Sequence, residues 1–550
     1  AGTVDLGVGE LVAAPGAIID VSGGGRVESG SRGEPILRAG NAGSVRLGGL
    51  RAGMDLEALD LRAYALGNAG SLALMTTDSV TIGAVERDDA ALHVPASLFA
   101  QDGFGNVSIS VMSDGGDIVI PEGADIVQAA VGLDLALLDY HRLATGERLA
   151  DHLPATMPRL EQRVARGASG LSLGTRGGDI VVGQGARVRT EVGGSLALAA
   201  GVNGGTVVVA GRLEAPSGRI DLAGTQVTLS AGGELLARGT PVIYRDARGW
   251  RRGEVRDGGA ISINTARLAL ARGGLVDVSG ASGSIDEPSY GLWGPRDPQA
   301  VTLDSNGGSI SISGTGLVES TLRGLAGGPR AAGGRLRFDM QAASGPDGSA
   351  AERLRQAMQW MDPDCYGLAG NGVCDYSNWQ EALDFDWSPL IGGAAPFVIP
   401  SALLAHLEDR KELVSEGLPA PALESEPLDP AAFGLSDAAL DFFRDSLLYS
   451  DLLREVLQSP GKIHALTVRP GAFAAGGFAD LALVNSVQGA IRLDGVDVSA
   501  NRSMVLSGQL VGHEGTSSSL RAPHIALSAM ATPGGSAPVA QGGAGRLALN

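Results

Sequence analysis

Short stretches in which apolar and polar residues alternate, separated by glycines, run through most of the chain. Residues 103–111 alternate in this way, and a second alternating stretch at 117–120 follows the turn at Gly115-Gly116. Successive side chains of a β-strand point to opposite faces, so alternation places one face inward and the other in solvent. The glycines between such stretches supply the positive φ angles that tight corners need. The pattern therefore predicts short strands joined by glycine-rich turns.

The same strand-turn-strand unit occurs twice, once early and once late in the chain. Each copy has a Phe, then four residues later a Gly-Phe pair, then an alternating strand: Phe99, Gly103 and Phe104 in one copy, and Phe473, Gly477 and Phe478 in the other. A Gly-Gly turn followed by apolar alternation also recurs, as does the block apolar-Asp-Val-Ser at residues 19–22, 276–279 and 496–499. Repetition of one supersecondary piece is typical of a repeat architecture.

These repeats predict an all-β fold, a right-handed parallel β-helix (solenoid). Strands start every ~10–20 residues between 171 and 230, which suits coils of two or three short strands. Packed β-sandwich domains would need larger core residues than the Val, Leu, Ile and Ala available here. Roughly 360 residues at ~20 per coil would give on the order of 18 coils and a rod of ~85 Å.

Interruptions of the pattern predict the domain organisation. We expect β-helix over residues 1–123, 169–340 and 462–550, with loop excursions at 236–257 and 285–300. Leucines at helical spacing predict a helical insertion at 124–168. A larger helical insertion is expected at 341–461, where Ser401 and Ser436 stand at N-cap positions.

Charge and aromatic residues single out the 341–461 insertion. The chain has 84 glycines among 550 residues, only 4% aromatic residues and a net charge of −19, so nucleic acid is a poor candidate partner. Residues 341–460 contain 20 acids and 6 bases. The insertion therefore becomes the predicted contact surface, with aromatic anchors at Trp360, Tyr366, Tyr376, Trp379 and Trp387. The alternative is a cap that only covers the rod.

The two cysteines, Cys365 and Cys374, lie nine positions apart in this insertion. A local disulfide is predicted, which would imply an oxidising compartment, and two free thiols are the alternative. Residues 362–367 resemble the start of a Ca²⁺ loop, but Val373 stands where a bidentate Glu is required, so no metal site is predicted. The recurring Asp20, Asp277 and Asp497 are interpreted as solvated strand-end residues rather than a cation ladder.

Searches for other chemistry give no catalytic residue and no cofactor site. The seven histidines form no His-Glu-x-x-His pair, no Gly-x-Ser-x-Gly elbow is present, and no phosphate loop occurs. No apolar run reaches the ~18 residues of a membrane span. The first residues lack the features of a signal peptide and already follow the strand pattern, so we expect a segment of a longer protein.

The Phe and Gly-Phe units, the Gly-Gly-Asp-Ile-Val turns and the apolar-Asp-Val-Ser-Gly blocks resemble the filamentous haemagglutinin family of two-partner-secreted exoproteins. The resemblance covers about two thirds of the chain. It implies a secreted β-helical rod at the cell surface, which acts in adhesion or as a stalk and passes an outer-membrane transporter during secretion. The chain departs from the family pattern because it shows no amino-terminal secretion domain and has an unusually large helical insertion at 341–461.

The sequence thus predicts a non-enzymatic rod segment of a secreted adhesin. Its expected partner is a protein or glycan on a host or neighbouring cell. Two alternatives stay open: a β-helical polysaccharide lyase or hydrolase, and a filament subunit that self-associates through the rod ends. Parallel β-helix enzymes need carboxylate clusters on one face, and the sequence alone shows none.

Overall fold

The structure is a computed structural model. It describes residues 2–340 and 465–528, with gaps at 8–10, 12–15, 30–34, 55, 84–89, 134–154, 157–165, 202–203, 292–293, 486–489, 494, 508 and 513–516. Across these residues the regular structure is β, apart from three short 3-10 helices: η1 (Leu56–Ala58), η2 (Ala96–Phe99) and η7 (Pro470–Phe473). The predicted all-β class is therefore confirmed for the described part of the chain.

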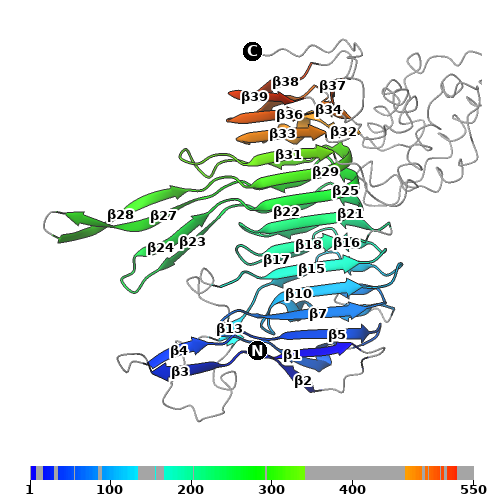
Figure 1. Cartoon of the computed structure of the whole chain (residues 1–550), viewed down its shortest axis with the longest axis vertical. Coiled ribbons are helices and arrows are strands. Elements are labelled where there is room, and N and C mark those ends of the chain that lie inside the picture. Colours follow the sequence, from blue (N-terminus) through cyan, green and yellow to red (C-terminus); the bar gives the residue numbers. More distant parts are fainter. Residues whose placement is uncertain are drawn as a thin grey trace, which may run out of the picture.

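Most strands belong to one large parallel sheet (Figure 1), in which two ladders share three long strands. The first ladder contains, in order, β1 (Thr3–Gly7), β5 (Ser44–Leu50), β7 (Gly70–Thr76), β10 (Phe104–Val111), β15 (Gly170–Thr175), β18 (Ser195–Ala199), β21 (Arg219–Leu229), β25 (Ala260–Leu270), β29 (Ser309–Val318), β31 (Arg335–Met340), β33 (Asp480–Asn485), β36 (Ser503–Ser507) and β39 (His524–Ser528).

The second ladder runs beside the first and includes the C-terminal halves of β21, β25 and β29. Its other members are β9 (Leu92–Val94), β8 (Val80–Ile82), β11 (Ile118–Ile120), β16 (Ile180–Val182), β19 (Thr206–Val209), β32 (Ala465–Val468), β34 (Ala490–Leu493) and β37 (Gln509–Gly512). All of these pairs are parallel, so neighbouring strands need a crossover rather than a hairpin between them.

A third ladder forms a separate six-stranded parallel sheet. Its members are β12 (Asp125–Gln128), β17 (Arg187–Thr190), β20 (Arg212–Glu214), β22 (Glu234–Leu236), β26 (Leu275–Asp277) and β30 (Thr321–Arg323). Two further parallel pairs are β2 (Ala17–Asp20) with β6 (Leu59–Arg62), and β35 (Asp497–Ser499) with β38 (Ser519–Arg521). Between residues 170 and 323 the chain visits the first, second and third ladders in turn.

The core consists of aliphatic side chains stacked strand over strand. One column in the first ladder follows the parallel register through eleven strands, and each of its members is at most 2% exposed: Val45, Leu72, Val107, Leu171, Leu196, Ile220, Ile261, Ile310, Leu336, Leu481 and Met504. The buried residues of all three ladders form one cluster. The alternation in the sequence is therefore the alternation between this core and the outer surface.

The repeated Phe unit folds the same way at both of its positions. In each copy a second-ladder strand, β9 or β32, leads into a 3-10 helix that ends at Phe99 or Phe473. Gly103 and Gly477 then adopt φ of 81° and 86°, and Phe104 and Phe478 are buried. The backbone carbonyls of Asp102 and Gly476 accept equivalent hydrogen bonds, from the N–H groups of Ala63 and Gly324. The repeat read from the sequence is thus a structural repeat.

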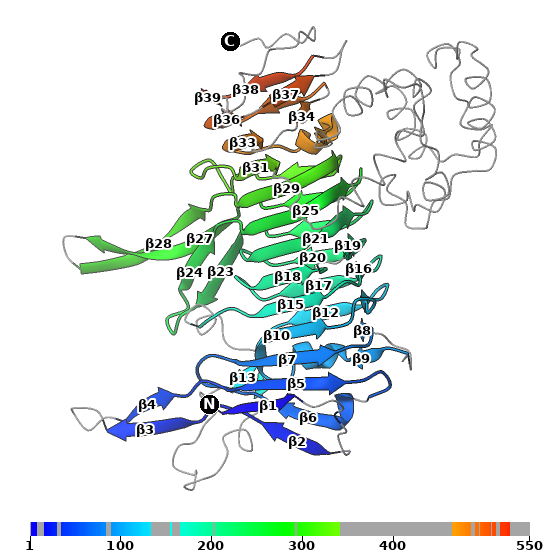
Figure 2. The same cartoon turned by 45° about the vertical axis from the view of Figure 1, so that its right-hand side comes forward.

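Four antiparallel hairpins leave the parallel strands (Figure 1): β3 (Gly25–Ser29) with β4 (Pro35–Ala39), β13 (Gly132–Leu133) with β14 (Ala155–Thr156), β23 (Thr240–Arg245) with β24 (Arg251–Arg256), and β27 (Ser282–Gly291) with β28 (Gly294–Asp304). Each lies on a connection from the strands β2, β12, β22 or β26 to the next first-ladder strand. We call this corner the hairpin edge. In Figures 1 and 2 three of the hairpins extend to the left of the ladders.

Several expectations differ from the structure. The excursions expected as loops at 236–257 and 285–300 are β-hairpins, because complementary strands on either side of a tight turn satisfy their own backbone groups. Within the helical insertion expected at 124–168, residues 125–128 form strand β12, and the other described residues form no helix. The whole insertion expected at 341–461, with both cysteines and all five aromatic anchors, lies outside the described residues.

The described ladders are shorter than the expected rod. Thirteen first-ladder strands at a spacing of ~4.8 Å give about 58 Å, against the ~85 Å predicted. We call the stretch of chain from one first-ladder strand to the next a level. The difference in length arises because some levels include a hairpin and therefore use more residues for the same rise. The level from Ser195 to its register partner Arg219 contains no hairpin, whereas the two following levels, which end at Ala260 and at Ser309, each contain one and are much longer.

Replacing Gly103 by Ala should lower the free energy of unfolding by more than ~1 kcal/mol. Its φ of 81° disfavours a side chain, and a Cβ there would lie 2.7 Å from the carbonyl carbon of Ala63. Gly123→Ala is the matched control, because Gly123 has φ of 73° but no atom within 4 Å of the added Cβ. Denaturant unfolding of both variants measures the difference, and equal losses would contradict a role for the close approach to Ala63.

Candidate binding site

The two central hairpins of the hairpin edge lie side by side. Figures 1 and 2 show β23–β24 next to β27–β28, and β24 contacts β27. A Cβ added at Gly283 on β27 would meet Ile243, Val255 and Pro241 within 3.1 Å. This close apolar contact holds the two hairpins together as one unit, which we call the hairpin pair.

Charge also joins the two hairpins. Residues 240–256 contain five arginines and two acids, whereas residues 282–304 contain one arginine and four acids. Arg251 donates to the carboxylate of Asp286 from its backbone N–H at 2.8 Å, from Nη2 at 2.7 Å and from Nε at 3.2 Å. The hydrogen bonds from the Arg251 side chain and backbone lower the pKa of Asp286. Opposite charges thus fix the relative position of the hairpins.

Trp250 is the last residue of the turn between β23 and β24. The guanidinium carbons of Arg248 and Arg252 lie 5.5 and 5.0 Å from its ring centroid, within the range of cation–π contacts. Asp246 accepts hydrogen bonds from the backbone N–H groups of Arg248 and Trp250 and from Arg252 Nε. The turn therefore holds two guanidinium groups against one aromatic ring in a fixed arrangement.

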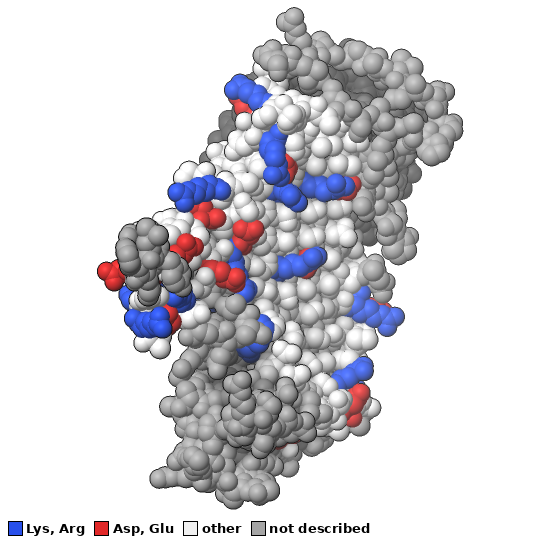
Figure 3. Space-filling view, turned by 60° about the vertical axis from the view of Figure 1, so that its left-hand side comes forward, with Lys and Arg blue, Asp and Glu red and all other residues white. Residues whose placement is uncertain are grey.

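Charged side chains are otherwise few on the broad surface in Figure 3, where most blue groups touch a red one, and more of them gather on the projection at its left. The paired charges on the first ladder include Arg46 with Asp5, Arg219 with Asp221 and Arg337 with Asp339. Serine, alanine and glycine occupy most of its other outward positions between β7 and β29. The outer face of the large sheet therefore carries few charged side chains, whereas the hairpin pair carries many of both signs.

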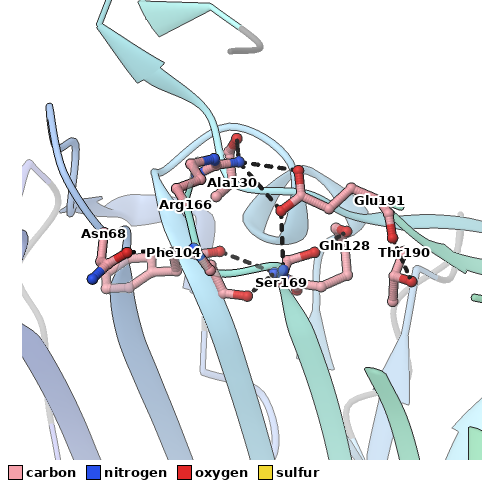
Figure 4. A network of polar contacts seen from close by, with 10 residues as sticks. Asn68, Phe104, Gln128, Ala130, Arg166, Ser169, Thr190 and Glu191 are labelled. Carbon is pink, nitrogen blue, oxygen red and sulfur yellow. Dashed lines mark hydrogen bonds and ion pairs between the residues drawn. The ribbon is translucent and has the colours of Figure 1, made fainter. Parts of the chain in front are cut away.

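A second polar site is buried between β12 and β17 (Figure 4). Arg166 Nη2 lies 3.0 Å from Glu191 Oε2, and their side chains are only 11% and 4% exposed. Arg166 also donates to the carbonyl of Ala130, and Glu191 accepts from the Ser169 backbone N–H. The Gln128 side-chain amide donates to the carbonyls of Phe104 and Gly105. These bonds tie residue 166, where the chain returns to the ladders, to both neighbouring levels, so we assign this site a structural role.

A third polar group surrounds Asp102, next to the first Phe unit. Burial raises the pKa of Asp102 to about 7, with a smaller contribution from the charge of Asp60. Burial also raises the pKa of Tyr64 nearby. Asp60 is itself paired with Arg62, at 2.9 Å from Arg62 Nε. Asp102 occupies the position that Gly476 holds in the second Phe unit, so the fold of the unit does not require a carboxyl group there.

The recurring Asp-Val-Ser blocks connect neighbouring levels. Asp20 and Asp277 each accept a hydrogen bond of 2.9 Å from the backbone N–H two residues later, at Ser22 and Ser279. The two serine hydroxyls accept from the backbone N–H groups of Tyr64 and Leu325 in the following level. Asp277 is 1% exposed, so its interpretation as a solvated residue was wrong. Asp497 is exposed and bonds Ser519 instead.

The residues predicted from the sequence to bind a partner, Trp360, Tyr366, Tyr376, Trp379 and Trp387, lie outside the described residues, as do Cys365 and Cys374. Among the described residues, no group of three or more His, Cys, Asp or Glu could hold a metal ion. None of the helices in the described part is long and apolar enough to cross a membrane. The hairpin pair was not predicted from the sequence, although five arginines within residues 240–256 of a chain with net charge −19 are a signal that points to it.

Comparison with known proteins adds no assignment. No family model, no curated protein and no solved structure matches this chain. The hairpin pair is therefore the candidate binding site on geometry and charge alone.

The raised pKa of Asp102 predicts how stability depends on pH. Between about pH 4, the ordinary pKa of Asp, and pH 7, the folded protein holds a proton that the unfolded chain releases, so stability falls as pH rises through this window. Asp102→Asn should therefore raise the melting temperature at pH 8 and have little effect at pH 4.

Asp480→Asn should show the opposite dependence of stability on pH. Arg502 lowers the pKa of Asp480 to about 2, so this substitution should destabilise at pH 7 and become neutral near pH 2. Melting curves across pH test both.

Arg166→Ala should destabilise the fold by about 3 kcal/mol, because it leaves the Glu191 carboxylate buried without its partner. The double variant Arg166→Ala/Glu191→Gln should lose less than the two single changes added together. Chemical unfolding of the four proteins in this cycle measures the coupling. Strictly additive losses would show that Arg166 and Glu191 do not stabilise one another.

Proposed function

We propose that this chain is a rod segment of a secreted adhesin, and that it presents binding elements along the hairpin edge. In this proposal the three ladders are the faces of a right-handed parallel β-helix. The rod performs no chemistry of its own. Its role is to hold the hairpin pair, and the insertion predicted at 341–461, away from the surface to which it is attached.

One observation carries the proposal: the hairpins are additions that the ladders do not need. The corner that holds β23–β24 and β27–β28 is closed elsewhere by only four residues, at 191–194 and at 215–218. Strands β21 and β25 pair over ten residues across the first of these hairpins, so the register is kept without interruption. Strands β25 and β29 also pair across the second hairpin, with one irregularity between Asn264 and Arg267. Elements that leave the stack at one edge while the strands on either side still pair are suited to presentation rather than to support.

The shape and surface of the ladders agree with a supporting role. The stacked aliphatic column gives a narrow core that can be extended level by level, as in other repeat proteins. Secretion, surface attachment and passage through an outer-membrane transporter rest on the resemblance of the Phe units and Asp-Val-Ser blocks to filamentous haemagglutinins. The expected partner is a protein or glycan on another cell, and Trp360, Trp379 and Trp387 stay predicted anchors of a second contact surface.

A hairpin-free variant tests the proposal. Residues 237–259 and 278–308 would each be replaced by Ala-Pro-Ser-Gly, the sequence that closes the same corner at 215–218. We expect the variant to keep the circular dichroism of a β-protein and to lose most of the binding of the full-length chain to cell surfaces, measured with fluorescently labelled protein. Undiminished binding by a folded variant would contradict presentation at the hairpin edge.

A polysaccharide hydrolase is the second candidate, because Asp102 is a carboxyl group whose pKa of about 7 suits a general acid. The nearby Asp60 would be the charged carboxylate of the pair. Incubation with acidic and neutral polysaccharides, followed by an assay for new reducing ends without unsaturation, separates the candidates. Release of such ends by the native chain but not by Asp102→Asn would replace the adhesin proposal with a hydrolase.

A further inference from the structure

We propose that the tip of the β23–β24 hairpin binds a linear polysaccharide that carries carboxylate groups, through Arg245 and Arg248. This inference rests on the proposed function, since it assigns a ligand class to one of the presented elements. It depends on three features of the hairpin: two arginines outside its ion pairs, a rigid turn that holds them, and neighbouring arginines that already bind carboxylates.

The first feature is that two of the arginines in residues 240–256 lie outside the ion pairs of the hairpin. Three of the five arginines are paired with acids: Arg251 with Asp286, Arg252 with Asp246 and Arg256 with Glu254. Among the described residues, Arg245 and Arg248 form no ion pair, and both are exposed. The pKa of Asp286 is lowered chiefly by its hydrogen bonds from Arg251, and the charge of Arg245 adds only a lesser effect. Two guanidinium groups are thus available to an anionic ligand at the end of an arm.

The second feature is that these groups are held in place before any ligand arrives. Arg245 Nη1 donates to the carbonyl of Gly249 at 2.8 Å, across the turn. Arg248 stacks on Trp250, and the Asp246 carboxylate accepts hydrogen bonds from the backbone N–H groups of Arg248 and Trp250 within the turn. Ordering long side chains costs affinity when they are free to move. Arginines that are already restrained lose less freedom when they bind.

The third feature indicates the chemical class of the ligand. The hairpin pair already contains three arginine–carboxylate contacts: Arg251 with Asp286, Arg252 with Asp246, and Arg256 with Glu254. The planar guanidinium matches a carboxylate in geometry as well as in charge. A ligand carboxylate at Arg245 or Arg248 would repeat a contact that this hairpin already makes with its own side chains.

The small number of free charges favours a sugar chain over a denser polyanion. Nucleic acids bind through many phosphate contacts, and the described hairpin offers two free arginines on a chain of net charge −19. Tyr244, paired with Arg252 across the hairpin and half-buried, adds an aromatic surface to the same hairpin. Aromatic rings combine apolar contact with hydrogen bonding and suit a ligand that is rich in hydroxyl groups.

The test measures binding of polygalacturonate to the full-length chain and to two variants with equal changes in charge. Arg245→Gln/Arg248→Gln removes the proposed site. Arg187→Gln/Arg189→Gln is the matched control, because these two arginines are also exposed but lie on β17, beside Asp125 and Glu214 in the parallel register. We expect wild-type protein and the control to bind alike and the Arg245/Arg248 variant to bind about tenfold more weakly, at unchanged melting temperature.

Other probes decide the ligand class. No binding of polygalacturonate, or equal weakening in both variants, would overturn the site. Tighter binding of dextran sulfate or of polyglutamate through the same two arginines would overturn the choice of a carboxylated sugar, in favour of sulfate or of an acidic peptide. The proposed function fails separately: it falls if the hairpin-free variant still binds cells, whereas this inference falls alone if that variant loses cell binding and Arg245→Gln/Arg248→Gln does not.

Discussion

The structure depends on one packing interaction, the stacking of an aliphatic side chain on its equivalent in the next parallel strand. Parallel register brings like positions together, so each buried Val, Leu or Ile contacts the same kind of side chain above and below. Because a one-residue slip would turn every buried side chain outward, this stacking fixes the register of each new strand. It also explains why aliphatic residues of similar size dominate the core.

Regular stacking makes the corners between strands tolerant of change. Closing a longer loop costs little additional free energy, because the entropy of loop closure rises only slowly with length. A hairpin also satisfies its own backbone hydrogen bonds, so it can leave the stack without creating buried unpaired groups. The first ladder therefore keeps one register across the short level before β21 and across the level that β23–β24 lengthens, and β25 and β29 pair across the β27–β28 level with a single irregularity between Asn264 and Arg267. Function can be added at such corners with little effect on the core.

The two Phe units show how the stack continues after an irregular segment. Each follows a second-ladder strand, places a 3-10 helix against third-ladder strands, and then delivers a buried Phe at the head of a new first-ladder strand. In the second copy the strand before the unit begins directly after residues 341–464. Phe473 packs edge-on against Phe338, with ring centroids 6.4 Å apart, which links helix η7 after that long segment to strand β31 before it. Phenylalanine side chains thus occur where the regular aliphatic column does not by itself determine the path of the chain.

The sequence alone determined the all-β class, the alternation that separates core from surface, and the duplication of the Phe unit, because these depend on residue types at fixed short spacings. It did not reveal that Asp277 is buried, that residues 125–128 form a strand, or that two expected loops are hairpins. It also gave no sign that Arg251 meets Asp286, or that Arg166 meets Glu191. Those contacts join residues 35 and 25 positions apart. Only the tertiary structure decides these contacts, because the stacking of strands determines which distant corners of the chain become neighbours. The pattern of charges along the sequence does not show which residue will lie opposite a given charge.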